Sequence, residues 1–138
     1  MSADQVRETM ESYVRALQER GDYGRFFADG IEFSIAGTDQ AASGAEGTEQ
    51  MIRFMHEVAF DAQPEIVNLV CGERGAAIEA VFVGTHTGEF AGIPASGNAV
   101  RLPYSVLYDV DGDKITALRI YMSVEALIGQ IRVPAAVG

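Results

Sequence analysis

The chain has 138 residues, 48% of them apolar, and a formal net charge of −10. A chain of this length can bury a hydrophobic core without disulfides or metal, so we expect one domain over residues 1–138. The acidic balance argues against a nucleic-acid partner and against anionic membranes, because both attract basic surfaces. No apolar run reaches the length of a membrane span, and the N-terminus has no apolar signal core. The single cysteine, Cys71, fits a reducing compartment, and we expect a cytoplasmic protein.

The first third of the sequence predicts two helices and a strand. Apolar residues recur at helical spacing over residues 4–19, and Gly21 follows the expected end of this helix. The apolar stripe consists of Val6, Met10, Tyr13 and Leu17. A short second helix is expected over residues 22–29. Alternating apolar and polar residues predict a strand over residues 31–36, and the small residues of 37–47 predict a loop.

The middle of the sequence predicts a third helix and the start of a sheet. Thr48 is expected to cap this helix, which runs to about Phe60, and Pro64 is expected to end the segment. A strand is then expected around residues 66–70, and a hairpin turn at residues 73–75 leads into the next strand.

A long antiparallel ribbon dominates the last half. Residues 76–90 and 99–110 are rich in strand formers, and the glycines and proline of residues 92–97 turn the chain between them. A last strand is expected over residues 115–122, and Ser123 is expected to cap a C-terminal helix.

The order of elements is therefore α-α-β-α-β-β-β-β with a closing helix. Helices gather at the front and antiparallel strands at the back, which indicates an α+β layout in which helices cover one face of a bent sheet. The final residues, 133–138, are expected to be loose.

Several motifs of the second half resemble a known family. GTHTGEF at residues 84–90, GIPASG at 92–97 and DGDKI at 111–115 are followed by RIY and the closing helix. In this order they resemble the SnoaL-like polyketide cyclase and ester cyclase branch of the nuclear transport factor two-like superfamily. The resemblance implies a cone-shaped α+β barrel whose curved mixed or antiparallel sheet has helices packed on its concave face. It also implies a hydrophobic pocket and an enzyme for an apolar, polyketide- or terpenoid-like carbonyl compound. The implied chemistry is cofactor-free acid/base isomerisation, cyclisation or a lyase step.

The same resemblance suggests which carboxylates are missing. Tyr13 matches the helix that supplies an oxyanion-hole tyrosine in ketosteroid isomerases, whereas the two carboxylates of those isomerases fall at Ser105 and near Ser34. Ser123 stands where this branch commonly has an aspartate. The positions that match the Asp-Arg-Asp set of limonene epoxide hydrolases are Phe82, Ala80 and Ile120.

Two residues remain as predicted catalytic groups. His86 is the expected proton carrier, because a histidine exchanges protons near neutral pH, and strand alternation puts it on the face of Phe82. The alternative is a structural histidine bonded to the glycine-rich loop. Tyr13 is expected to donate a hydrogen bond to a carbonyl, and its alternative is a core aromatic. His56 is expected at the solvent edge of the third helix.

The remaining predictions concern ligands and partners. The residues expected to contact a substrate are Phe33, Met51, Met55, Phe82, Ser105 and Ile120. Two histidines without ligand spacing and the lack of a glycine-rich phosphate loop give no reason to expect a metal or a cofactor.

Two alternatives stay open. The missing carboxylates allow a non-catalytic protein of the same fold that binds or shapes a hydrophobic ligand. Tyr104, Val106 and Tyr108 are expected to share the outer face of their strand, and so apolar a face predicts a homodimer. The expected partners are therefore an apolar small molecule and a second copy of the chain.

Overall fold

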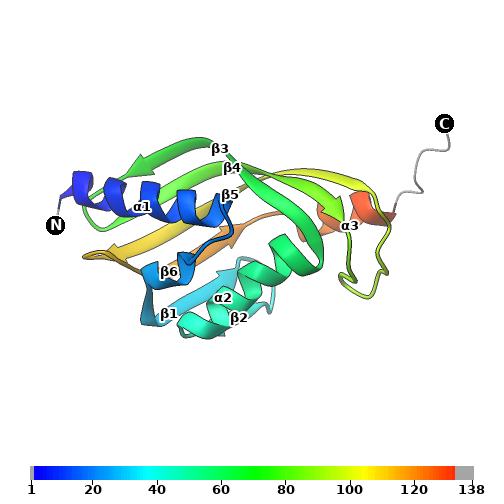
Figure 1. Ribbon diagram of the computed structural model, residues 1–138, viewed down its shortest axis with the longest axis horizontal. Coiled ribbons are helices and arrows are strands. Elements are labelled where there is room, and N and C mark those ends of the chain that lie inside the picture. The colour runs from blue at the N-terminus through cyan, green and yellow to red at the C-terminus, as the bar shows by residue number, and fades with distance from the viewer. Residues whose placement is uncertain (1, 133–138) are drawn as a thin grey trace.

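A six-stranded mixed sheet and three α-helices make up the computed structural model over the residues it describes, 2–132 (Figure 1). The strands follow one another across the sheet in the order β2-β1-β6-β5-β4-β3. The elements are α1 (Ala3–Gln18), β1 (Phe27–Ile35), β2 (Ala41–Ser43), α2 (Ala45–Arg53), β3 (Phe60–Cys71), β4 (Gly75–His86), β5 (Ala99–Asp111), β6 (Lys114–Tyr121) and α3 (Val124–Arg132). The expectation for residues 133–138 lies outside the described part of the chain.

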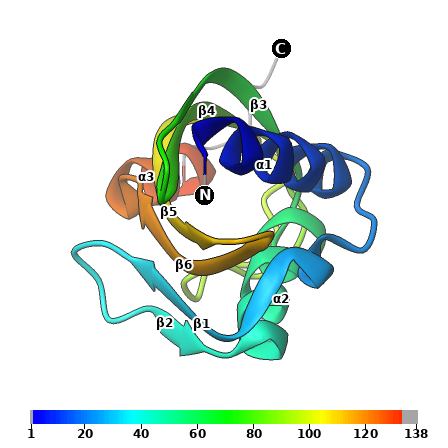
Figure 2. The same ribbon diagram turned by 90° about the vertical axis from the view of Figure 1, so that its left-hand side faces the viewer.

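The sheet is strongly curved but not closed. Figure 2 shows it bending from β3 round to β2, with α1 and α2 on its concave side. All neighbouring strands pair antiparallel except β1 and β6, which pair parallel. The expected α+β class with a cone-shaped sheet is therefore confirmed.

The first helix, α1, has a capped start and one apolar face that packs against the sheet. The Ser2 hydroxyl accepts a hydrogen bond from the Gln5 amide at 3.2 Å, and the Gln5 side chain accepts one from the Ser2 amide at 3.0 Å. This reciprocal capping box satisfies two backbone donors at the helix start. The stripe that includes Val6, Met10 and Tyr13 is buried against the sheet, so the predicted helix over residues 4–19 is confirmed within one residue at each end.

Residues 22–60 differ from the prediction in several places, and the loop expected over residues 37–47 contains the short strand β2. The expected helix over 22–29 is only a 3-10 turn, Tyr23–Phe26, because β1 begins at Phe27 and needs its apolar residues for the core. The expected Thr48 cap is wrong, since α2 follows Gly44, whose φ of 92° suits glycine, and Thr48 is buried inside the helix.

The second helix also ends differently from the expectation. After Arg53 it widens into a π-helical turn, Phe54–Val58, before β3 starts at Phe60. Pro64 does not end the segment but lies within β3. β3 is an edge strand, where a residue without an N–H is tolerated.

The long ribbon is confirmed, but the facing of its second strand, β5, was predicted wrongly. β4 and β5 pair from Gly75 opposite Asp109 to Thr85 opposite Ala99. The expected outer-face trio, Tyr104, Val106 and Tyr108, points inward instead. Val106 and Tyr108 are buried, and so are Ile78 and Ala80, the register partners of Val106 and Tyr104 on β4. The alternate residues of β5, which include Ser105, Arg101 and Leu107, therefore face outward.

Two apolar clusters fill the concave side. The larger one packs α1 against β1, β4, β5 and β6, whereas the smaller one joins β3, β4 and β5 to α3. The helix α3 is held as expected, since the Ser123 hydroxyl accepts a hydrogen bond from the Ala126 amide at 3.1 Å. Leu127 and Ile131 then pack against Phe60 and Phe82 in the smaller cluster.

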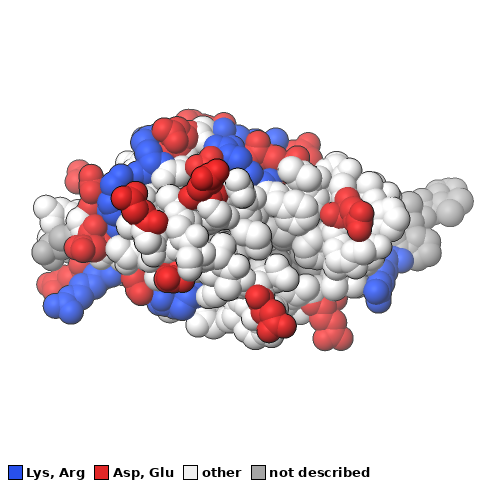
Figure 3. Space-filling view, turned by 90° about the horizontal axis from the view of Figure 1, so that it is seen from below, with Lys and Arg blue, Asp and Glu red and all other residues white. Residues whose placement is uncertain are grey.

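Charge is unevenly spread over the surface. Figure 3 shows that acidic and basic side chains gather towards the N-terminal end of the face seen from below, while the middle of this face carries few. No helix within residues 2–132 combines the length and apolar character needed to cross a membrane.

Candidate functional site

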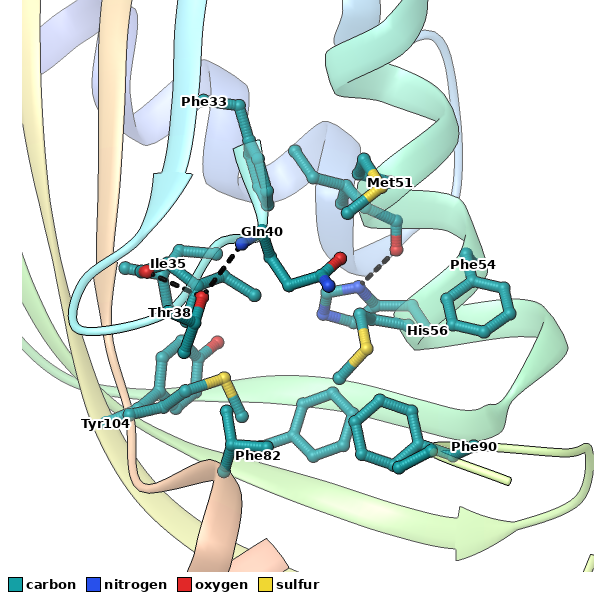
Figure 4. A pocket seen from close by; sticks show the side chains of 16 residues that line it. Phe33, Ile35, Thr38, Gln40, Met51, Phe54, His56, Phe82, Phe90 and Tyr104 are labelled. Carbon is teal, nitrogen blue, oxygen red and sulfur yellow. Dashed lines mark hydrogen bonds between the residues drawn. The ribbon is translucent and has the colours of Figure 1, made fainter. Parts of the chain in front are cut away.

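A cavity of about 370 Å³ lies between the concave face of the sheet and the end of the second helix (Figure 4). Its walls come from β1, α2 with its π-helical turn, β4, β5, β6 and the loop after β4. Most of the lining is apolar, and no carboxylate of the described residues contributes to it. Five of the six predicted substrate contacts line it, namely Phe33, Met51, Met55, Phe82 and Ile120. That they contact a substrate stays a prediction.

Ser105 does not line this cavity. It pairs with Glu79 on one side and with Tyr121 on the other, and it shares the outer face of the sheet with them. The predicted position of Ser105 in the pocket is therefore wrong. The physical reason is the period of two along a strand, which turns its neighbour Tyr104 to the cavity instead.

The end of the second helix presents His56 to the cavity. His56 follows Ile52 by four residues, so both lie on the helix face that lines the cavity. The π-helical turn that carries His56 is held from outside by Arg20. The Arg20 guanidinium donates to the carbonyls of His56 at 3.2 Å and Ala62 at 3.1 Å, and it pairs with Asp61. Single π-helical turns of this kind are frequent at functional sites.

The hydrogen bond of His56 determines what its ring can do. Nδ1 lies 2.8 Å from the Ile52 carbonyl oxygen, which only accepts, so Nδ1 carries the proton. In the neutral ring Nε2 is then an acceptor, and this buried atom has no partner among the described residues. The pKa of His56 is lowered from its ordinary value, chiefly by burial and further by Arg20, against the raising effect of the Ile52 hydrogen bond. At neutral pH the site therefore offers an uncharged base.

Tyr104 is the second polar ring of the cavity. It projects inward from β5, and its ring packs edge-on against Phe82 with 6.4 Å between centroids. Burial raises the pKa of Tyr104 well above its ordinary value, so its hydroxyl stays protonated. Phe82 also packs edge-on against His56 at 5.4 Å, and so it lies in contact with both polar rings.

Tyr13, the predicted oxyanion donor, lies outside the cavity lining. It sits in an aromatic cluster of the larger core, with edge contacts to Tyr23, Phe26 and Tyr108 between 5.8 and 6.4 Å. Burial is the main cause that raises the pKa of Tyr13 far above its ordinary value, and a hydrogen bond to the Tyr108 side chain opposes this shift. Its surroundings match the alternative of a core aromatic.

His86 also lies outside the lining, although it faces inward as strand alternation predicted. It is 0% exposed and stacks beside Phe60 at 5.3 Å. The Ser96 amide donates to His86 Nδ1 at 3.1 Å, and the Ser96 hydroxyl lies 2.9 Å from the same atom. The backbone of His86 also bonds to Gly97 and Asn98. These contacts match the alternative of a structural histidine that anchors the glycine-rich loop.

The sequence contained a signal for His56 that our prediction did not use. Met51, Ile52, Met55 and His56 have the i, i+1, i+4, i+5 spacing of one helix face. Met51 and Met55 were predicted to contact a substrate, so His56 on the same helix face could have been expected to line the cavity as well. For Tyr104 no comparable signal existed, since both faces of β5 contain apolar residues.

Comparisons with known proteins agree on the fold. A protein from Jannaschia sp. CCS1, named as a SnoaL-like polyketide cyclase, superposes with a TM-score of 0.85 at 20% identity over 96% of this chain and 95% of that one. TsrD from Streptomyces laurentii superposes with a TM-score of 0.78 at 21% identity over 96% and 98%. A protein with a ketosteroid isomerase-like fold from Catenulispora acidiphila DSM 44928, solved with trimethylamine, gives 0.74 at 18% identity over 92% and 94%.

The sequence comparisons identify the family of this chain. No curated protein matches this sequence. The family model of SnoaL-like polyketide cyclases matches residues 4–131, which is nearly the whole chain. The chain therefore belongs to the SnoaL-like polyketide cyclase family.

Proposed function

We propose that the protein is a cofactor-free acid/base enzyme that acts on an apolar, polyketide- or terpenoid-like carbonyl compound in the cavity of about 370 Å³. Family membership supports a small-molecule enzyme, since the fold serves such enzymes. The observation that carries the proposal is the His56 ring, which lines the mostly apolar cavity and whose Nε2 atom is buried and has no partner within residues 2–132. An uncharged base in such a place can take a proton from a carbon acid.

The proposed reaction starts at a carbon next to the substrate carbonyl. The C–H bond breaks, its proton goes to His56 Nε2, and its electron pair forms the C=C bond of an enolate while the carbonyl π pair moves to oxygen. The proton returns to another carbon in an isomerisation. In an aldol closure the enolate carbon attacks a second carbonyl of the same molecule, and the proton goes to the new alkoxide. Both sequences balance without an oxidant or a reductant.

A non-catalytic ligand-binding protein is the second candidate. It is favoured by one observation, which is that no Asp or Glu of the described residues lines the cavity. In that case the apolar walls would hold or shape a ligand, and His56 would serve only as a hydrogen-bond acceptor.

Proton exchange into a simple ketone separates these candidates. The probe is 4-phenyl-3-buten-2-one in D₂O, whose methyl protons are acidic and whose size suits the cavity. We expect the protein to bind it and to speed methyl exchange, followed by proton NMR, at least about 100-fold beyond free imidazole at equal concentration. Saturable binding without faster exchange would contradict the enzyme and favour the binding protein.

A further inference from the structure

Among residues 2–132, four polar side chains line the cavity, namely Thr38, Gln40, His56 and Tyr104, and they differ in whether a proton remains available to a ligand. Thr38 uses its hydroxyl proton on the Ile35 carbonyl at 2.8 Å, and its oxygen accepts from the Gln40 amide at 3.0 Å. His56 uses its Nδ1 proton on Ile52. The donors still free for a ligand are therefore the Tyr104 hydroxyl and the Gln40 side-chain amide.

These two donors differ in burial. Gln40 is exposed, so its amide already bonds to water when no ligand is bound. The Tyr104 phenol is half-buried in the mostly apolar wall of the cavity, and its hydroxyl has no hydrogen-bond partner among the described residues. A donor without a protein partner in an apolar wall gains free energy from a ligand acceptor, whereas an exposed donor gains little from exchanging water for a ligand. A carbonyl oxygen is therefore recognised mainly at Tyr104.

Tyr104 and His56 lie on different sides of the cavity. Figure 4 shows the Tyr104 hydroxyl near Thr38 and the His56 ring on the side of α2. Phe82 lies in edge contact with both rings, at 6.4 and 5.4 Å between centroids, so a flat molecule packed on Phe82 can meet both. Its carbonyl oxygen would lie at one ring and its acidic carbon at the other.

We propose that the Tyr104 hydroxyl holds the carbonyl oxygen of the substrate while His56 exchanges the proton, so that the cavity selects flat, enolisable ketones with one buried carbonyl. This inference rests on the proposed function and adds a second catalytic residue to it. As charge moves to oxygen in the enolate, the Tyr104 hydrogen bond strengthens while the phenol keeps its proton. Donors placed where charge develops act most strongly in a site that excludes water.

Infrared spectroscopy of the bound probe tests Tyr104 directly. The probe is 4-phenyl-3-buten-2-one labelled with ¹³C at the carbonyl, and the variants are Tyr104→Phe and, as a matched control, Tyr121→Phe on the outer face. The wild type and Tyr121→Phe should lower the carbonyl stretching frequency relative to an apolar solvent, and Tyr104→Phe should not. Loss of one hydrogen bond should also weaken binding roughly five- to tenfold. Methyl exchange should slow about 100-fold in Tyr104→Phe.

The outcomes distinguish this inference from the proposed function. Methyl exchange in the wild type, together with an unchanged carbonyl frequency and affinity in Tyr104→Phe, overturns the role of Tyr104 and leaves the acid/base proposal standing. A wild type that neither binds nor exchanges the ketone overturns the proposed function, and this inference with it. Loss of the frequency shift in Tyr104→Phe, with the shift kept in Tyr121→Phe, supports the role of Tyr104.

Discussion

The two histidines show how hydrogen bonds give the same side chain different roles. His56 donates from Nδ1 to the Ile52 carbonyl, which leaves Nε2 as an acceptor in the cavity wall. His86 accepts at Nδ1 from the Ser96 amide, so in the neutral ring Nε2 carries the proton. Only the first arrangement leaves an unprotonated Nε2 on a residue that lines the cavity.

The first prediction concerns the pH dependence of exchange. The uncharged form of His56 is the base, and burial lowers its pKa below the ordinary value of 6.5. The exchange rate should therefore rise with pH, pass half-maximum below pH 6.5 and stay level at neutral pH. The measurement is kcat for methyl exchange in the ketone between pH 5 and 8. A midpoint above 6.5 would contradict a buried neutral base.

At the scale of single residues, the sequence predicted the apolar lining of the cavity better than the polar groups within it. Five predicted contacts line the cavity because apolar residues at helical and strand periods identify inward faces. The choice between His56 and His86 depended on a hydrogen bond to Ser96 and on a π-helical turn, and neither follows from periodicity.

At the scale of elements, two local features stand out, one where α2 meets β3 and one where β3 pairs with β4. The π-helical turn brings α2 into β3, and Arg20 bridges the carbonyls of His56 and Ala62 across this junction. β3 and β4 approach so closely at Gly84 that a Cβ there would lie 2.6 Å from Ala62 Cα.

The second prediction is that Gly84→Ala destabilises the protein. The new methyl group has to displace the backbone of β3, and we expect a loss of about 1–3 kcal/mol in the free energy of unfolding. The measurement is urea unfolding followed by circular dichroism. The control is Gly129→Ala in α3, where a Cβ meets nothing within 4 Å and better helix propensity should add up to about 1 kcal/mol. Equal stability of the two variants would contradict the close approach of β3 and β4 at Gly84.

Helix starts were predicted well where a capping side chain marks them. Helix starts and strand facing were predicted poorly where tertiary packing determines them. Ser123 was correctly predicted as a helix cap, because its side chain caps the backbone locally. Thr48 has the same capping propensity, but the chain starts α2 at Gly44 and buries Thr48 instead. The facing of β5 could not be predicted, since Leu107 and Pro103 on one side look as apolar as Val106 on the other.

At the scale of the whole molecule, the concave side combines a tightly packed half and a hollow half. The larger core buries Tyr13 and Tyr108 completely beneath α1, whereas the cavity lies between that core and α3. The outer face exposes Leu107 at 39% and Tyr121 at 46%. Pairing of two chains through this face stays a prediction, as does a cytoplasmic location, and sedimentation velocity of the wild type against Leu107→Glu would test the pairing.

The third prediction is that the molecule loses stability at alkaline pH. Burial raises the pKa of Tyr13 and of Tyr108 above the ordinary value of 10.0. The folded chain therefore keeps these protons above pH 10, where the unfolded chain releases them, and stability falls as pH rises. The fall is up to about 1.4 kcal/mol per pH unit for each phenol. Urea unfolding between pH 8 and 11 should show a shallower fall for Tyr13→Phe, and an equal slope would contradict the buried pair.

The most direct test of the account compares the two histidines under one assay. Asparagine reproduces the Nδ1 position of either ring but lacks Nε2, so His56→Asn keeps the contact to Ile52 and His86→Asn keeps the contact to Ser96. The measurement is methyl exchange in the bound ketone, corrected for the folded fraction. We predict a loss of at least about 100-fold for His56→Asn and a change within about threefold for His86→Asn. Full activity in His56→Asn, or a 100-fold loss confined to His86→Asn, would contradict the account.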